Sequence, residues 1–186
     1  MIQPKNISFL IYECFQTTYK MKEEVYMHYE NAAAEFAGLI SSFSQKEINA
    51  IPYEGSWTAA QVGVHVLKSN KSIAQALNME AQPADRSPDE RVGELKAVFL
   101  DFKTKLKSPD FIIPEPGNYK KETLSADLDK SIDELKSLSK KVSLSGTIRH
   151  VAFGDITKLE LMHFVVYHTQ RHSHQLKKIL ESVKNK

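Results

Sequence analysis

The stretch TKLELMHFVVYHTQRHSHQLKKILES, residues 157–182, decides the fold class because its apolar residues recur with the period of an α-helix. Thr157 and Glu160 have the spacing of a capping box, so we expect the helix to begin here and to reach about Ser182. One stripe of this helix would face a protein core. It consists of Leu161, Val165, His168, His172, Leu176 and Ile179. Two imidazoles therefore lie among aliphatic side chains on the buried side.

Apolar stripes of the same period predict four more helices. The first begins at Met21. The second extends from Thr58, the N-cap of a capping box that Gln61 completes, to about Met79.

The third predicted helix begins at Ser87, with Pro88 at its first helical position and Glu90 completing a capping box. Its apolar stripe extends to Leu106. The fourth helix follows the segment 110–118, whose Pro and Gly residues cannot continue a helix.

Five amphipathic helices without convincing strand alternation predict an all-α fold, an antiparallel four-helix bundle with one additional helix. A looser array of helices is the alternative that this pattern leaves open. We expect a single domain over residues 21–186, preceded by an N-terminal extension over residues 1–20, where no period is sustained. Gly146 and Gly154 bracket a segment that we expect to be irregular.

The composition excludes several classes of protein. The chain has 186 residues, 25 Lys+Arg, 23 Asp+Glu and one cysteine, Cys14. A net charge of 25 − 23 = +2 gives no strong field for nucleic acid, which is not an expected partner. One cysteine can form neither an internal disulfide nor a thiolate zinc knuckle. No apolar run is long enough for an export signal or a membrane span, so we expect a soluble cytoplasmic protein that does not bind membranes.

The pair His168 and His172 has the spacing of a helix-borne metal site, because side chains four residues apart lie about 5–6 Å from each other. By chance alone, a chain of this composition is expected to contain roughly 0.25 histidine pairs with this spacing. Buried histidines that bind no metal are also commoner than histidines that do. A third histidine, His65, would leave coordination positions open for water or substrate, as in catalytic zinc sites. His65 shares a small, partly polar helix face with Val62, Ser69, Ser72 and Ala76.

The other histidines of the last helix are not expected to be ligands. His163 and His174 lie about 140° and 120° around the helix from His168, so they are lateral or solvent-facing. Thr169 follows His168, where helical zinc proteases have their glutamate base, so peptide hydrolysis is disfavoured.

Three segments carry more extended motifs. In GSWTAAQVGVH, residues 55–65, a histidine follows a tryptophan by eight residues. RHVAFGDIT, residues 149–157, precedes YHTQRH, residues 167–172. These segments resemble the Trp-to-His element, the loop and the closing His-x-x-x-His helix of the DinB-like family. The resemblance covers about Met21 to the C-terminus, and Val151 stands where the family loop usually has proline.

The resemblance implies a four-helix bundle in which His65, His168 and His172 bind a divalent metal, commonly zinc or nickel, at one end of the core. The first, second, fourth and fifth helices would form this core, with the segment 87–107 packed beside it. Characterised relatives include thiol S-transferases that use bacillithiol or mycothiol and a mycothiol-dependent maleylpyruvate isomerase, while others are called metal-dependent hydrolases. Relatives often pair, so the resemblance also admits a homodimer.

Further residues are assigned supporting roles. We expect His150 at the pocket rim rather than among the ligands, and Trp57 as a structural anchor at the head of its helix. Arg171 either orients an anion at the rim or is solvated or ion-paired. A solvated face is expected for Lys103, Lys105 and Lys107.

The favoured hypothesis is an enzyme whose divalent metal lowers the pKa of a bound thiol or water, which then attacks a small-molecule substrate. In the transferase version a low-molecular-weight thiol is the cofactor, since Cys14 lies in the extension. In the hydrolase version the proton acceptor is unidentified. One alternative is a non-catalytic metal- or small-molecule-binding protein of stress response. Another is a bundle whose three histidines bind no metal and which serves mainly for dimerisation.

Overall fold

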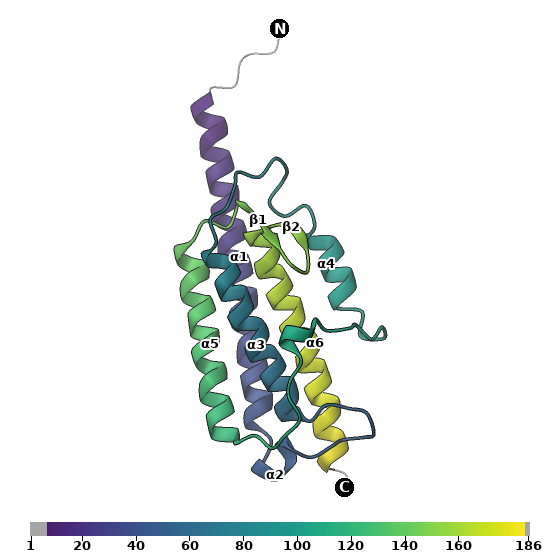
Figure 1. Cartoon of the computed structure of the whole chain (residues 1–186). Helices are drawn as coiled ribbons and strands as arrows, with labels where there is room; N and C mark the ends of the chain where they lie inside the picture. Colours follow the sequence, from purple (N-terminus) through teal and green to yellow (C-terminus); the bar gives the residue numbers. More distant parts are fainter. Residues whose placement is uncertain (1–6, 185–186) are drawn as a thin grey trace.

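Four long helices carry the core of the computed structural model, which describes residues 7–184 (Figure 1). They are α1 (Ile7–Ser41), α3 (Ala59–Asn78), α5 (Lys121–Lys141) and α6 (Lys158–Lys184). The shorter elements are α2 (Gln45–Ile48), α4 (Val92–Phe99), the 3₁₀ turn η1 (Asp110–Ile112) and the strands β1 (Thr147–His150) and β2 (Gly154–Thr157). The side chains of residues 7–11 and 13–15, Cys14 among them, lie outside the described part. The all-α class that the sequence predicts is confirmed.

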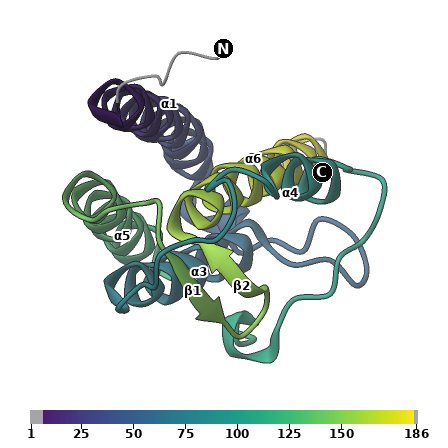
Figure 2. The same cartoon turned by 90° about the horizontal axis from the view of Figure 1, so that it is seen from above.

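The long helices form a bundle, and α4 packs beside it against α6, as expected for the segment 87–107 (Figure 2). Helices α1 and α6 run in one direction, and α3 and α5 run in the other (Figure 1). Neighbours are therefore antiparallel in the pairs α1–α5 and α3–α6, and parallel in the pairs α1–α6 and α3–α5. The long connection over residues 79–120 allows this order, because it returns the chain along the bundle before α5 begins. No helix within residues 7–184 is both long and apolar enough to cross a membrane.

The bundle core consists of two apolar clusters with a polar layer between them. One cluster includes the strand residues Ile148 and Ile156, and the other includes Ile48 of α2. On α3, α5 and α6, buried polar side chains stand between residues of one cluster and residues of the other. They are Ser69, Asn70, Ser131, His168, Thr169, His172 and Ser173, and His65 lies one turn before Ser69 on α3, among residues of the second cluster. The histidines singled out by the sequence therefore lie inside the core.

The first helix begins earlier than predicted. We expected it at Met21, but α1 already includes Ile7–Ser41. No Pro or Gly stands between Ile7 and Gly38, so nothing in the sequence interrupts the helix. The expectation was wrong because the N-terminal turns lack an apolar period, and an apolar period marks burial rather than helix formation. Residues 1–6 of the expected extension lie outside the described part of the chain.

The segment expected to be irregular, between Gly146 and Gly154, is instead mostly a β-hairpin. Strands β1 and β2 pair antiparallel, with Ile148 opposite Ile156, and Gly154 has the positive φ of 64° that the turn requires. Each strand has only four residues, too few for an alternating pattern to stand out in the sequence. The expectation of no strand is thus corrected.

The third predicted helix begins later than Ser87. The Ser87 hydroxyl donates to the side chain of Asp89 instead of capping a helix, and α4 starts only after Arg91. The backbone N–H of Arg91 donates to Glu160 of α6, 2.8 Å away. A carboxylate from another helix thus replaces the local capping box that we expected with Glu90.

The same helix also ends sooner than predicted. Asp101 accepts hydrogen bonds from the backbone N–H of Lys103 and the hydroxyl of Thr104, a local turn that competes with helix formation. Leu106, the expected end of the apolar stripe, therefore lies in a loop, and so does Phe102, which is 42% exposed.

Glu160 joins the start of α6 to the start of α4. Its capping box with Thr157 is confirmed, since the Thr157 N–H donates to Glu160 and the Glu160 N–H donates to the Thr157 hydroxyl. Arg86 binds the same carboxylate through both terminal nitrogens. Burial alone would raise the pKa of Glu160, but the hydrogen bonds from Arg86, Thr157 and Arg91 outweigh burial and hold the pKa below its ordinary value.

We predict that Glu160→Gln lowers the free energy of unfolding at pH 7 by about 2–3 kcal/mol, because Arg86 loses its buried charged partner. The folded-state pKa of Glu160 is depressed, so its contribution is present above the ordinary value of 4.5 and is lost as the pH falls through the folded-state value. The difference between wild type and variant in urea unfolding should therefore shrink below pH 4.5.

Glu94→Gln is the matched control. Glu94 pairs with Arg91 at 3.4 Å on the surface, where such a pair contributes about 0–1 kcal/mol. Equal losses of stability in the two variants would contradict the role assigned to Glu160.

Candidate metal centre

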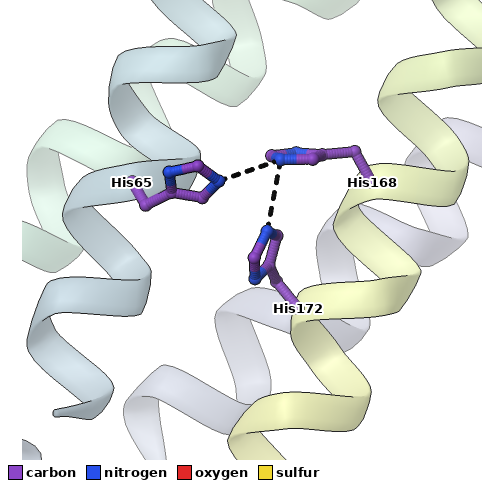
Figure 3. A group of neighbouring side chains, drawn as sticks. All are labelled: His65, His168 and His172. Atoms are coloured by element: carbon purple, nitrogen blue, oxygen red, sulfur yellow. Dashed lines mark hydrogen bonds between the residues drawn. The ribbon is translucent and has the colours of Figure 1, made fainter. Parts of the chain in front are cut away.

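Three histidines from two helices meet in the polar layer (Figure 3). His65 projects from α3, and His168 and His172 project from successive turns of α6. Nε2 of His168 lies 3.0 Å from Nε2 of His65 and 3.2 Å from Nε2 of His172. All three side chains are buried, and one ring nitrogen from each lies within 4.8 Å of the others. The three residues named from the sequence are thus brought together inside the core.

Hydrogen bonds on the outer side of two rings determine which nitrogen faces the cluster. His65 Nδ1 lies 2.9 Å from the backbone oxygen of Ile112, which can only accept, so Nδ1 donates. His172 Nδ1 lies 2.9 Å from Oε1 of Gln175 and donates in the same way. Each neutral ring then has its proton on Nδ1, and its Nε2 directs a lone pair towards His168. Such outer partners are typical of metal-binding histidines.

The surroundings keep the three imidazoles uncharged. Burial, followed by the nearby His172 and His65, lowers the pKa of His168 well below its ordinary value. Burial and the neighbouring His65 lower the pKa of His172 to about 3. Burial likewise lowers the pKa of His65. Neutral imidazole is the form that binds metal ions, so these rings need lose no proton near pH 7.

This donor set fits a divalent cation. Two lone pairs face Nε2 of His168, which has at most one hydrogen to donate, so one lone pair lacks a hydrogen-bond donor within the cluster. A cation would bind all three nitrogens. Zn–N bonds of about 2.0–2.1 Å in a tetrahedral site separate the nitrogens by about 3.3 Å, close to the separations found here. Three protein ligands leave a coordination position open.

A cavity of about 330 Å³ opens onto the cluster, and all three histidines line it. We call it the apolar cavity because most of its other walls are aliphatic or aromatic. These walls include Ile73, Val98, Phe99, Phe111, Ile112, Phe153 and Phe164. Ser69 and Ser72, predicted to share the face of His65, line it as well, so the small residues do leave room beside the histidine.

The sequence profile of the DinB superfamily matches residues 28–176, a span that contains all three histidines. This chain belongs to the DinB superfamily. No curated protein and no solved structure gives a match. Membership in the DinB superfamily and the cluster of three buried histidines together fit a metal-binding protein.

His150 lies in the hairpin that contains the DinB-like loop motif. It is buried, lines the apolar cavity and stacks on Phe153, with ring centroids 5.1 Å apart. Its Nδ1 accepts the backbone N–H of Ala152 at 3.2 Å, so the neutral ring has its proton on Nε2. His150 is not part of the metal-competent group found among the described residues.

Three other aromatic side chains lie close to their expected places. Trp57 packs against the second apolar cluster at the head of α3, as an anchor would, and its ring lies 5.1 Å from that of His65. His174 is half-buried and stacks on Phe102. His163 is also half-buried, beside Tyr167. Both histidines are lateral, as the helical phase predicts.

Arg171 has a contact that the sequence did not suggest. Its guanidinium donates to the backbone oxygens of Phe99, Asp101 and Thr104. It therefore fixes the loop after α4, and the alternatives of a solvated or ion-paired side chain do not describe it. The guanidinium also lines the apolar cavity beside the histidines.

Two partners of the histidines were missed from the sequence. Gln175 follows His172 by three residues on one helix face, a spacing that could have indicated the contact. Ile112 contributes only a backbone carbonyl from a loop with several prolines, and its residue type gives no signal for such a role.

We predict that His168→Ala abolishes tight metal binding, because two histidines remain of the three proposed ligands. His174→Ala should leave the metal content unchanged. Elemental analysis of the two variants beside wild type, all loaded with zinc or nickel and dialysed, checks this. One ion per chain in His168→Ala would refute the assignment, and loss of metal from His174→Ala would show that the helical phase is misassigned.

We predict that Gln175→Ala weakens metal affinity by about 10–100-fold, because His172 loses the acceptor that orients its ring. Gln170→Ala on the same helix is the control, since Gln170 lines neither the cluster nor its cavity. Competition with a chromogenic chelator measures both affinities. Equal metal affinities of the two variants would contradict the role of Gln175 in orienting His172.

Proposed function

We propose that this protein is a divalent-metal-dependent enzyme that transfers a thiol sulfur to a small apolar electrophile. The observation that carries the proposal is the convergence of three neutral Nε2 atoms on one wall of an otherwise largely apolar cavity. A divalent ion held there by His65, His168 and His172 would lower the pKa of a thiol or water bound in its open position.

The lining of the apolar cavity favours a thiol over water as the nucleophile. No Asp or Glu is among the described residues that line it. Hydrolysis needs a group that accepts a proton from water, whereas a thiol has an ordinary pKa near 8.5 and needs less assistance to ionise. Sulfur transfer therefore requires less of the residues that are present.

The chemistry proposed is a substitution at carbon. The thiolate sulfur forms a C–S bond while the leaving group departs with the electron pair of the bond that breaks, and the thiol proton passes to solvent. The phenylalanines of the cavity would hold the apolar part of the electrophile. His150, with its proton on Nε2, would donate a hydrogen bond to an acceptor atom of the substrate.

The test uses metal-loaded protein with chlorodinitrobenzene and a small thiol such as N-acetylcysteine. We predict formation of the thioether above the uncatalysed rate for wild type and a loss of at least about tenfold in the catalysed rate for His168→Ala. Absorbance of the adduct measures the rate, and each protein is assayed with and without thiol.

Two outcomes would overturn the proposal. Hydrolysis of aryl esters that needs the metal but no thiol would identify the second candidate, a hydrolase. Binding of metal without turnover of any electrophile or ester would favour a non-catalytic binding protein.

A further inference from the structure

A second cavity, of about 610 Å³, adjoins the apolar cavity. The two share part of their walls, because Leu106, Lys107, Ser108, Arg171 and His172 line both. A molecule in the second cavity would therefore lie beside the wall that holds His172.

The charge around this second cavity has one sign. Its lining contains five cationic side chains and, among the described residues, no Asp or Glu. We call it the cationic cavity, after Lys103, Lys105, Lys107, Arg171 and Lys178. The whole chain has a net charge of only +2, so five cations around one cavity are a local concentration.

These charges are not neutralised by ion pairs. Among the described side chains, no salt bridge joins any of the four lysines to a carboxylate. Asp101 lies beside Arg171 but does not line the cavity, and its oxygens accept hydrogen bonds from Lys103 N–H and the Thr104 hydroxyl. The sequence predicted a solvated face for the first three lysines, and they are exposed, but they also surround a cavity.

The loop that carries three of the cations, Lys103, Lys105 and Lys107, is held in place by contacts within the protein. Arg171 holds the backbone oxygens of Phe99, Asp101 and Thr104, which bracket Lys103. Phe102 of the same loop stacks on His174, with ring centroids 4.3 Å apart. Fixing the loop in advance lowers the entropy cost of binding.

We propose that the cationic cavity binds a small molecule with two or more negative charges, such as a polycarboxylate or a phosphate ester. Clustered cations without a carboxylate raise the local concentration of anions and stabilise them once bound. The cavity also has flat side chains, Tyr53, Trp57 and Phe102, against which a small organic anion can pack.

Binding of the anion does not depend on the proposed function, but the role that we assign to the anion does. In that role it is the co-substrate that brings the thiol, held in the cationic cavity, while the electrophile occupies the apolar cavity. Binding itself depends on the lysines and not on a metal, so the two can be tested separately.

Trp57 provides the readout, because it is the single tryptophan of the chain and lines the cationic cavity. Metal-free wild type is titrated with citrate, and with acetate as a singly charged comparison, and Trp57 fluorescence and calorimetry follow binding. The use of metal-free protein avoids chelation by citrate. We expect saturable binding of citrate that is on the order of tenfold or more tighter than that of acetate.

One triple variant removes three cations of the cavity, through Lys103→Gln, Lys107→Gln and Lys178→Gln. It should bind citrate on the order of tenfold or more weakly than wild type.

The matched control removes three exposed lysines outside the cavity lining, through Lys71→Gln, Lys96→Gln and Lys130→Gln. It changes the net charge equally and should retain the citrate affinity of wild type.

Three results would overturn the inference: no saturable binding of citrate, equal weakening in the two triple variants, or tighter binding of a single-stranded oligonucleotide than of citrate. Saturable citrate binding to the metal-free protein, together with no transferase activity of the metal-loaded protein, would instead retain the anion site and reject the proposed function. Transferase activity of the metal-loaded protein without any binding of citrate would retain the proposed function and reject the anion site.

Discussion

The imidazoles of His65, His168 and His172 meet through their Nε2 atoms inside an apolar bundle. Their remaining ring nitrogens need hydrogen-bond partners from the surrounding structure. A buried polar group without a partner costs about 1–3 kcal/mol. The backbone oxygen of Ile112 and the side chain of Gln175 accept the two outer protons. The connection after α4 is therefore tied to α3 through His65, although no apolar pattern in that connection requires it.

Helix α6 organises the walls around this contact. Besides two of the histidines it contains Glu160, which holds the start of α4, and Arg171, which holds the loop after α4. The same short helix thus receives one contact from the carboxylate and one from the guanidinium. Both cavities include residues from the end of α4 or the loop that follows it. The shape of the site depends on charged side chains of α6 as much as on apolar packing.

The elements that could be predicted from the sequence are those whose signal is local. Capping boxes placed the starts of α3 and α6, and the helical stripe placed His168 and His172 on one buried face. The prediction that His65 joins these two histidines rested on the family resemblance and on the small side chains that share its helix face. The errors came where contacts distant in the sequence decide the outcome. The start of α4 depends on Glu160, which lies 69 residues from Arg91.

The charge balance of the site explains why an anion suits it. Neutral imidazoles would leave a divalent ion held by them with its full charge, and no carboxylate among the described lining residues would offset that charge. Burial lowers the pKa of His168 most, and the nearby His172, His65 and Arg171 lower it further, so its imidazole stays neutral beside these cationic groups. In the proposed function, the same cations would stabilise a negative charge on a group in the open position of the metal. In the proposed function, neutral imidazoles and cationic walls would therefore act in one direction, because both favour the ionised form of a thiol or water at the metal.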